Sequence, residues 1–202
     1  PTRRSSDLVW VVSHGAGENL KSLGYEGEYR VVENGVDFPK GRVEDQAYIA
    51  EVTRDFGLPE EVPVYLFVGR LMSYKGLPLI LDALDLVNRS GQDFRMVFVG
   101  GGPDEEALKE TTAKYGLENR VIFVGPIHDR QALRAWNTRA DLFLFPSTYD
   151  TNGIVVREAA ACGLAGVLIR GSCAAEGITD GRNGFFIDEN AESLAALLRE
   201  LG

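Results

Sequence analysis

The sequence has little of what several specialised classes of protein require. Its 202 residues include only two cysteines, Cys162 and Cys173, and only two histidines, His14 and His128. Two cysteines are too few for a disulfide framework and have no metal-ligand spacing, so we expect buried thiols. The histidines lie far apart in the sequence and give neither a catalytic pair nor a metal cluster. The sequence therefore favours neither a disulfide-rich domain nor a metalloprotein.

Long hydrophobic runs and a surplus of positive charge are also missing. No apolar run approaches the roughly 20 residues needed to span a bilayer, and the start, PTRRSSDLVWVV, lacks a small-residue cleavage site after a long apolar region. The net charge is -9, from 21 basic and 30 acidic residues, so there is no basic surplus to neutralise a nucleic-acid backbone. These absences predict a cytoplasmic protein without a transmembrane segment and without a nucleic-acid partner. Any phosphate site must be local, built from a few basic residues and backbone amides.

Common catalytic motifs are absent too. There is no Gly-x-Ser-x-Gly elbow and no Gly-x-x-x-x-Gly-Lys phosphate loop, which weakens a hydrolase or NTPase interpretation. No two aspartates stand as Asp-x-Asp, so a metal held by such a motif is unsupported. What is present is an ordinary globular composition, with 45% hydrophobic and 25% charged residues. One domain with an appendage is expected, because domains run to about 100 to 200 residues.

Short apolar runs alternate with helix-length amphipathic segments from residue 64 onward, which is the pattern of βαβ units and a parallel sheet. The runs are apolar almost without interruption, as expected for strands that helices cover on both faces. We therefore predict an α/β fold, a doubly wound, Rossmann-like sheet from about Pro63 to the end. The expected strands are residues 64–69, 94–100, 120–125, 141–146, 165–170 and 184–188. The expected helices are residues 75–90, 104–115, 130–138, 153–162 and 191–201.

The first 60 or so residues differ in kind from the rest. Residues 7–13 read as a strand, residues 14–25 as a short helix ending near Gly24, and residues 29–39 as a strand running into an Asn-Gly turn. Residues 42–56 could form another helix. One strand-helix pair cannot cover its own apolar faces. It either docks on the main domain or is the end of a preceding domain absent from this chain.

Ligands of an open parallel sheet bind beyond the carboxyl ends of its strands, so the loops there are the first candidates. In residues 70–76, RLMSYKG, Arg70 and Lys75 lie where the chain leaves the sheet for the next helix. Arg supplies a planar fork and Lys a compact charge, so the two could grip an anion such as a diphosphate. The alternative is a solvated surface pair. The position of the loop favours the functional interpretation.

Two further loops follow strands. Residues 100–102 are three glycines before a helix that opens with acids, and these acids would repel a phosphate on that helix. We interpret this loop as a tight turn that lets the backbone approach a ligand closely. Residues 126–131, PIHDRQ, either recognise a base edge through their backbone or form a turn with Asp129 as helix cap.

The most informative stretch is residues 145–163, FPSTYDTNGIVVREAAACG. If a helix begins near Gly153, its first amides lack intrahelical partners and form an anion site, with Asp150 beside it. The helix is apolar around most of its circumference, yet it carries Glu158. A buried carboxylate needs a partner. The partner of Glu158 is either an arginine in a structural salt bridge, with Arg157 and Arg170 as the candidates, or ligand hydroxyls such as those of a ribose.

Several motifs stand in order along the chain: VVENGVD, FVGRLMSYKG, FVGGGPDEEALKE, RVIFVGPI, FPSTYDTNGIVVREAAACG and EGITDGRNGFFI. With them the chain resembles the retaining glycosyltransferases of the GT-B fold, family 4, from about residue 7 to the end. The resemblance implies two Rossmann-like domains, the second of which binds the nucleotide-sugar donor. It identifies residues 63–202 as that second domain, residues 1–25 as the last strand and helix of the acceptor domain, and residues 26–62 as a linker leading into the second domain.

The resemblance also implies site roles. Arg70 and Lys75 match the basic pair that binds the donor diphosphate, and no metal or other cofactor is implied. Asp150 and Glu158 match the two ends of the E-x7-E motif, where the first acid lies beside the donor sugar and the second binds the ribose. Asp150 departs from the motif and is one methylene shorter than glutamate. The remaining donor-binding positions are Gly69, Ile127 near the base, and Asn152, Gly153, Ile154 and Val155 along the phosphates and sugar.

The implied reaction is transfer of a hexosyl group from a nucleoside diphosphate sugar, with UDP as the expected nucleotide, to an acceptor hydroxyl with retention. The acceptor is not identified, and the missing N-terminal domain would complete the site. We therefore expect this chain alone to bind nucleotide and to transfer little sugar. The full-length protein would be cytoplasmic or lie peripherally at a membrane. The alternatives are a non-catalytic nucleotide-binding module of the same fold and, less well matched, a GT-B epimerase or phosphorylase.

Overall fold

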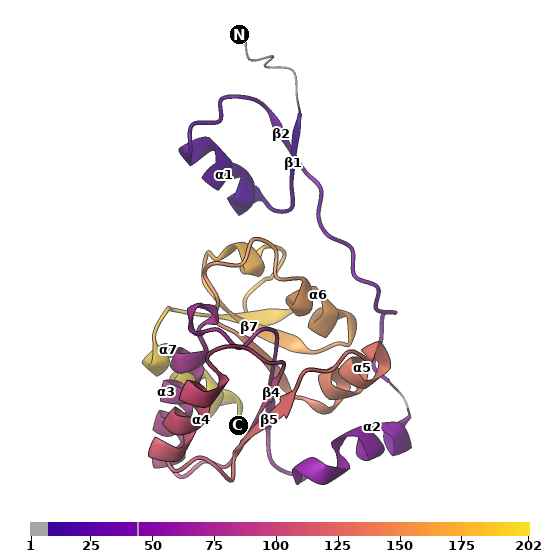
Figure 1. The fold of residues 1–202 in the computed structure, drawn as a ribbon, viewed down its shortest axis with the longest axis vertical. Coiled ribbons are helices and arrows are strands. Elements are labelled where there is room, and N and C mark those ends of the chain that lie inside the picture. The colour runs from indigo at the N-terminus through magenta and orange to yellow at the C-terminus, as the bar shows by residue number, and fades with distance from the viewer. Residues whose placement is uncertain (1–7, 44) are drawn as a thin grey trace.

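The computed structural model describes residues 8–43 and 45–202, which form a large α/β domain and a small N-terminal unit joined by an extended segment (Figure 1). We use the term N-terminal unit for residues 8–32. It contains β1 (Val9–Val11), α1 (His14–Ser22) and β2 (Tyr29–Val31). The predicted strand and domain boundaries before residue 8 lie outside the described residues.

The core of the large domain is one six-stranded, wholly parallel sheet with the order β5-β4-β3-β6-β7-β8. The predicted α/β fold with a doubly wound parallel sheet is confirmed. The strand order reverses between β3 and β6, and this pair is therefore the topological switch point where α/β sheets bind ligands. The strands are β3 (Val64–Val68), β4 (Arg95–Val99), β5 (Val121–Gly125), β6 (Leu142–Phe145), β7 (Ala165–Ile169) and β8 (Gly184–Ile187).

Helices cover both faces of the sheet. On one face α3 packs against both α4 and α7, and on the other α2 packs against α5 (Figure 1). The predicted helix over residues 42–56 is shorter, because α2 begins only after its cap at Asp45 and a 3-10 turn, Arg54–Phe56, follows it. The helices are α2 (Gln46–Thr53), α3 (Leu77–Arg89), α4 (Glu105–Lys114), α5 (Arg130–Arg139), α6 (Ile154–Ala161) and α7 (Ala191–Leu201).

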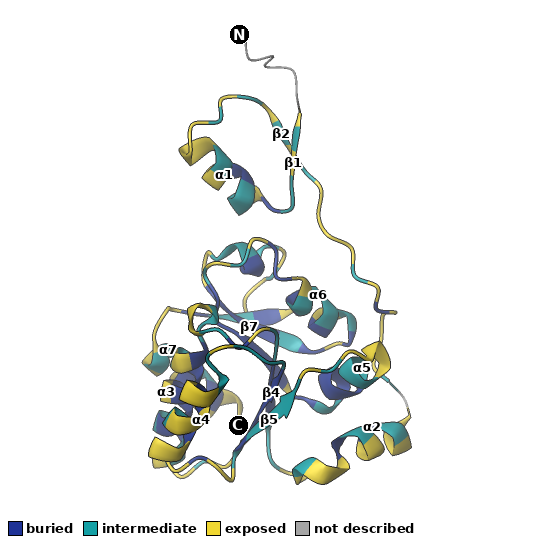
Figure 2. Cartoon of the chain, in the orientation of Figure 1, coloured by how far each residue is buried: buried dark blue, intermediate teal, exposed yellow. Residues whose placement is uncertain are grey.

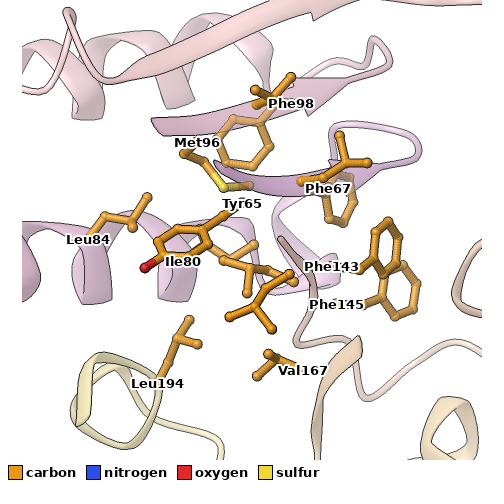
Figure 3. Close-up of a cluster of buried hydrophobic side chains, with 14 of the residues drawn as sticks. Tyr65, Phe67, Ile80, Leu84, Met96, Phe98, Phe143, Phe145, Val167 and Leu194 are labelled. Carbon is orange, nitrogen blue, oxygen red and sulfur yellow. The ribbon is translucent and has the colours of Figure 1, made fainter. Parts of the chain in front are cut away.

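The sheet is buried between these layers, as the dark band through the centre of Figure 2 shows. In Figure 3 Tyr65 and Met96 of the sheet lie toward Leu84 of α3 and Leu194 of α7, while Phe67 and Phe145 lie together on the other side of the cluster. The rings of Phe67 and Phe145 are stacked with centroids 5.9 Å apart, which joins β3 to β6. Each large side chain buried in this way contributes about 1.5–3 kcal/mol to stability. The junction of β3 and β6 is therefore part of the packed core.

The two cysteines are free thiols. Cys162 is fully buried, and this burial raises the pKa of its thiol, so the expectation of a buried thiol is confirmed there. Cys173 is only half-buried. Within the described ranges no helix has the length and apolar character needed to cross a bilayer.

The N-terminal unit pairs β1 with β2 in a separate parallel two-stranded sheet. The unit contacts the large domain, because both carboxylate oxygens of Glu176 accept hydrogen bonds from the first amides of α1, His14 at 2.9 Å and Gly15 at 2.7 Å. Apolar surface stays uncovered, with Trp10 68% exposed. The contact with the large domain therefore does not cover the apolar residues of β1, and the choice between docking and the end of a preceding domain stays open.

Candidate functional site

The loops after β3 and β6 meet at the switch point through an ion pair. Lys75 ends the 3-10 turn Ser73–Lys75 that follows β3, and Asp150 lies in the loop that follows β6. Lys75 Nζ donates hydrogen bonds to both carboxylate oxygens of Asp150, at 2.8 and 3.1 Å. Ser147 Oγ donates to the same carboxylate at 2.5 Å. Two residues that the sequence predicts to be functional are therefore in direct contact.

This ion pair is partly withdrawn from water, with the side chains of Lys75 and Asp150 13% and 22% exposed. The ammonium group lies 5.6 Å from the ring centroid of Phe145 and 5.7 Å from that of Tyr74. A charge held between aromatic rings and a carboxylate has few rotamers open to it, and its field is screened less than that of a solvated lysine. The Lys75 ammonium is therefore a preorganised positive charge at the edge of the sheet.

The contact between the two loops requires a glycine at position 76. Gly76 has φ +78°, and a Cβ atom there would lie 2.1 Å from the carbonyl oxygen of Pro146, directly after β6. Any side chain would therefore push the β3 loop away from the β6 loop. This close approach sets the position of the adjacent Lys75.

The N-terminus of α6 lies in the same loop as Asp150. Gly153 caps the helix in the left-handed conformation, with φ 56°. Within the described residues, the amides of Gly153, Ile154 and Val155 donate no hydrogen bond. Free amides at a helix N-terminus are suited to bind an anion, and the predicted anion site at this stretch stays a prediction. Asn152, just before them, is buried and donates from Nδ2 to the carbonyl of Val12 at 2.6 Å, while its Oδ1 atom is buried without a partner.

A cavity of about 330 Å³ opens beside this edge, between the loops after β3, β4 and β5. Three predicted site residues lie on its wall, namely Gly69, Arg70 and Ile127. The Arg70 side chain is exposed, and no ion pair of Arg70 is found in the described part of the chain. The wall is mostly backbone and apolar side chain, and its other members are Val68, Val99, Gly100, Gly101, Pro126 and Leu133.

The glycine loop after β4 lies against the loop after β3. A Cβ atom on Gly100 would lie 1.9 Å from the carbonyl oxygen of Gly69, and one on Gly102 would lie 2.2 Å from that of Leu71. Both glycines therefore let two protein loops touch. Gly100 and Gly101 also lie on the wall of the cavity, and around Gly101 a Cβ atom would have space. The close approach of this backbone to a ligand stays a prediction.

Glu158 has a salt-bridge partner, but neither of the two expected ones. Its Oε1 atom lies 3.3 Å from Arg130 Nη2, and the Glu158 side chain is only 14% exposed. The expected partners are wrong, since Arg157 pairs with Glu33 and Arg170 with Asp180. Arg130 also covers the ring of Phe38, with 4.6 Å between the guanidinium carbon and the ring centroid.

Sequence reasoning missed Arg130, although a signal for it exists. Arg130 is the first residue of α5, directly after the cap Asp129, whose side chain accepts from the amide of Gln131 at 2.8 Å. The predicted cap is thereby confirmed. Because this cap ends the loop after β5, Arg130 stands at the same edge of the sheet as Arg70 and Lys75. That edge rule, applied to every strand, would have singled Arg130 out.

A second missed residue is Asp104. Its carboxylate accepts hydrogen bonds from the amide and the hydroxyl of Ser73, at 2.6 and 2.7 Å, and so ties the loop after β4 to the turn that presents Lys75. The hydrogen bond from the Ser73 hydroxyl, followed by that from its amide, holds the pKa of Asp104 below its ordinary value. The Asp104 side chain therefore binds the turn at Ser73 and makes no capping hydrogen bond to the N-terminus of α4.

The predicted site residues thus form three groups along one edge of the sheet: the ion pair of Lys75 and Asp150, the amides that begin α6, and the cavity with Arg70. Glu158 faces Arg130 instead. Among residues 8–43 and 45–202 no group of three His, Cys, Asp or Glu side chains is placed to hold a metal ion.

A doubly wound parallel sheet with a preorganised cation, free helix amides and a cavity at its switch point defines a Rossmann-like α/β domain, and these groups are of the kind that bind anionic ligands. Comparison with known families agrees and goes further. The chain belongs to the family of glycosyl transferases group 1, whose model matches residues 49–201.

Similar proteins support the assignment. The chain is 33% identical over 190 residues to D-inositol 3-phosphate glycosyltransferase 2 of Catenulispora acidiphila. The aligned region covers 89% of this chain and 44% of that protein. The chain is 32% identical over 146 residues to the GDP-mannose-dependent alpha-(1-6)-phosphatidylinositol monomannoside mannosyltransferase of Mycolicibacterium smegmatis, covering 69% and 38%. The chain thus spans less than half the length of these relatives.

The fold also matches that of a solved structure. The crystal structure of Anabaena Alr3699/HepE in complex with UDP and glucose superimposes with a TM-score of 0.82. The match covers 96% of this chain and 52% of that one, at 24% sequence identity. At this identity the likeness shows the fold alone, and that fold is the Rossmann-like domain of GT-B proteins.

Proposed function

We propose that this chain is the donor-binding part of a retaining glycosyltransferase of GT-B family 4. It binds a nucleoside diphosphate sugar, whose hexosyl group moves to an acceptor hydroxyl. One observation carries the proposal: a preorganised lysine, Lys75, stands across the switch point from α6, whose first amides are free for an anion. A diphosphate fits between the Lys75 ammonium and the N-terminus of α6, because the ammonium is positive and the helix N-terminus carries partial positive charge.

In this proposal the cations do the work that a metal ion does in other transferases. Departure of the nucleoside diphosphate develops negative charge on its phosphates, and Lys75, Arg70 and the amides of residues 153–155 stabilise that charge. Because these groups are in place before the reaction, little reorganisation is needed as the charge develops. Asp150 holds Lys75 in position and lies beside the sugar. No metal enters the proposed step.

The cavity beside Arg70 fits the base. Its walls of glycine backbone, Pro126 and Ile127 can sandwich a flat ring and offer main-chain groups to the ring edge. We propose uracil, in line with the UDP in the Anabaena structure, and the GDP-mannose of the mycobacterial relative makes guanine the first alternative. Glu158 has one carboxylate oxygen, Oε2, that the Arg130 contact leaves for a ribose hydroxyl.

Two features support a larger protein. The uncovered apolar residues of β1 and the short share of the relatives' length are both consistent with an acceptor-binding domain before this chain. A donor domain without its acceptor domain can bind nucleotide but leaves the sugar open to water. We therefore propose that the isolated chain binds nucleotide and transfers little sugar.

Calorimetric titration with UDP, GDP and ADP tests the donor site. Lys75→Ala and Arg70→Ala should each weaken binding of the preferred diphosphate roughly tenfold or more, since hydrogen bonds to charged groups contribute about 1.5–3 kcal/mol. The corresponding nucleoside should bind these variants as it binds the wild type. Lys109→Ala, which removes an exposed lysine on α4, is the matched control. No detectable affinity of the folded wild type for any of the three nucleotides would refute the proposal.

Glu158 needs a separate experiment, because its salt bridge offers a structural explanation. If Glu158 binds the ribose, Glu158→Gln should weaken nucleoside and nucleotide by the same factor, whereas Arg130→Ala should leave most of the affinity. If the carboxylate is structural, both variants should lower the free energy of unfolding together and leave nucleotide affinity of the folded protein unchanged. Chemical denaturation beside calorimetry separates the two cases.

A further inference from the structure

Two exposed tyrosines flank the ion pair at the switch point. Tyr74 directly precedes Lys75, and Tyr149 directly precedes Asp150. Their rings meet edge to face, with centroids 6.0 Å apart and planes at 81°. The aromatic pair thus bridges the loops after β3 and β6 on the outer side of the ion pair, because the tyrosines are 47% and 75% exposed while the ion pair is mostly covered.

The two rings are available to a ligand. Aromatic side chains contribute most when their large apolar area is covered, yet Tyr149 leaves three quarters of its surface, 75%, in water. Neither hydroxyl makes a hydrogen bond within the described part of the chain, in contrast to the hydroxyl of Tyr115, which donates to Asp82 at 2.6 Å. The two rings contact each other and form one apolar patch with charged groups at its edge, and such patches mark ligand-binding surfaces.

The groups around the rings define what would bind. Tyr149 directly precedes a carboxylate, Asp150, which accepts hydrogen bonds. The ring of its partner Tyr74 lies 5.7 Å from the Lys75 ammonium, which donates them. A hexose in its chair form is complementary to this arrangement, since one face presents C–H groups and its edge carries hydroxyls that both donate and accept. A nucleobase could also stack, but the cavity beside Arg70 already offers a place for it.

We infer that Tyr74 and Tyr149 form a stacking platform for the apolar face of a hexose ring. The ring belongs either to the donor, as its glycosyl group, or to a sugar-bearing acceptor, and the chemistry of recognition is the same. The inference extends the proposed function. It rests on that function only where it identifies the hexose as the glycosyl group of the donor. It assigns a sugar contact to the chain itself, at residues outside the phosphate, ribose and base positions.

The experiment compares the wild type with Tyr149→Ala, Tyr74→Ala and Tyr149→Phe. Trp10→Ala is the control, because Trp10 is an exposed aromatic residue of the N-terminal unit. Calorimetry measures binding of UDP and UDP-glucose, and saturation-transfer NMR measures contact with methyl α-D-glucopyranoside in the absence of nucleotide. All changes lie at exposed positions, so the variants should fold, which thermal unfolding verifies.

A donor sugar on the platform predicts that Tyr149→Ala weakens UDP-glucose about fivefold and leaves UDP unchanged, since an aromatic contact contributes that much. An acceptor sugar predicts loss of the glucoside signal in Tyr149→Ala, with both nucleotides unaffected. In either case Tyr149→Phe and Trp10→Ala should behave as wild type. Equal UDP-glucose affinity and equal glucoside signal in all proteins would overturn the inference. If the wild type binds no UDP, the proposed function fails, and the glucoside measurement still decides on the platform.

Discussion

Gly76 shows how a single residue can set the geometry of the site. Its φ of +78° is shared by Gly171, around which a Cβ atom would meet nothing within 4 Å, whereas at Gly76 it would collide with Pro146. The two positions therefore form a matched pair that differs in packing and shares the backbone conformation. Any difference between them measures the contact of the two loops.

We predict that Gly171→Ala lowers the free energy of unfolding by about 1–2 kcal/mol, the cost of a left-handed alanine. Gly76→Ala should cost about 1–3 kcal/mol more, because overpacking against the Pro146 carbonyl is added. Chemical denaturation measures both. Gly76→Ala should also weaken nucleotide binding, since it moves Lys75. Equal destabilisation by the two substitutions would contradict the close contact.

Asp104 acts on the same turn through a titratable group. Because its folded pKa is held below the ordinary 3.8, its stabilising effect is complete above that value and is lost as the pH falls through the lower folded pKa. The hydroxyl of Ser73 is the largest cause. Ser73→Ala should therefore raise the pKa of Asp104 toward 3.8, as followed by carboxyl-carbon NMR titration. Asp180, whose pKa is lowered mainly by the amide of Phe186, should titrate unchanged and serves as the internal control.

At the scale of the element, the caps decide where the helices begin and which side chains reach the site. The side chain of Asp129 caps α5 and so determines where the helix begins and where its first residue, Arg130, lies. We predict that Asp129→Ala lowers the free energy of unfolding by about 1 kcal/mol, while Asp129→Ser keeps most of it. Chemical denaturation is the measurement. A loss in Asp129→Ser as large as in Asp129→Ala would show that the cap is not the cause.

The elements themselves could be predicted because their signal is local. The buried run of β3 is apolar at every position, and helix α7 repeats leucine at helical spacing, so both were located to within a residue or two. Glu158 was a harder case. Its need for a partner followed from its apolar helix, but the choice of Arg130 depends on how α5 is turned toward α6. The position of α5 is set by its packing against α2 and β3, and no spacing within either helix encodes it.

The glycines after β4 illustrate the same limit. Three in a row predict a close backbone approach, and the structure has one, but the approach of Gly100 is to the loop at Gly69. A sequence shows that a side chain is forbidden without showing what occupies its place. The partner of a close contact is a property of the assembled sheet.

At the scale of the whole molecule, the N-terminal unit and the candidate site share a support. The 3-10 turn Cys173–Ala175 packs against both: a Cβ on Gly15 would lie 2.3 Å from Cys173 Sγ, and one on Gly153 would lie 3.0 Å from the Cβ of Ala174. Glu176 ends this turn and holds the first amides of α1. The position of the N-terminal unit is thereby mechanically joined to the start of α6.

We predict that Glu176→Ala loosens the N-terminal unit, which the hydrogen bond from Asn152 to Val12 still holds, without unfolding the large domain. The amides of His14 and Gly15 lose their acceptors, so their hydrogen exchange should accelerate about tenfold, the factor for a lost bond of about 1.4 kcal/mol. Amides of the central strands β3 and β4 should exchange at unchanged rates, because their protection reflects the large domain alone. Glu118→Ala, at an exposed glutamate before β5, is the control and should alter neither group. Faster exchange in the central strands of Glu176→Ala would mean that the two parts unfold as one, and the carboxylate would then stabilise the whole fold rather than the docking of the N-terminal unit.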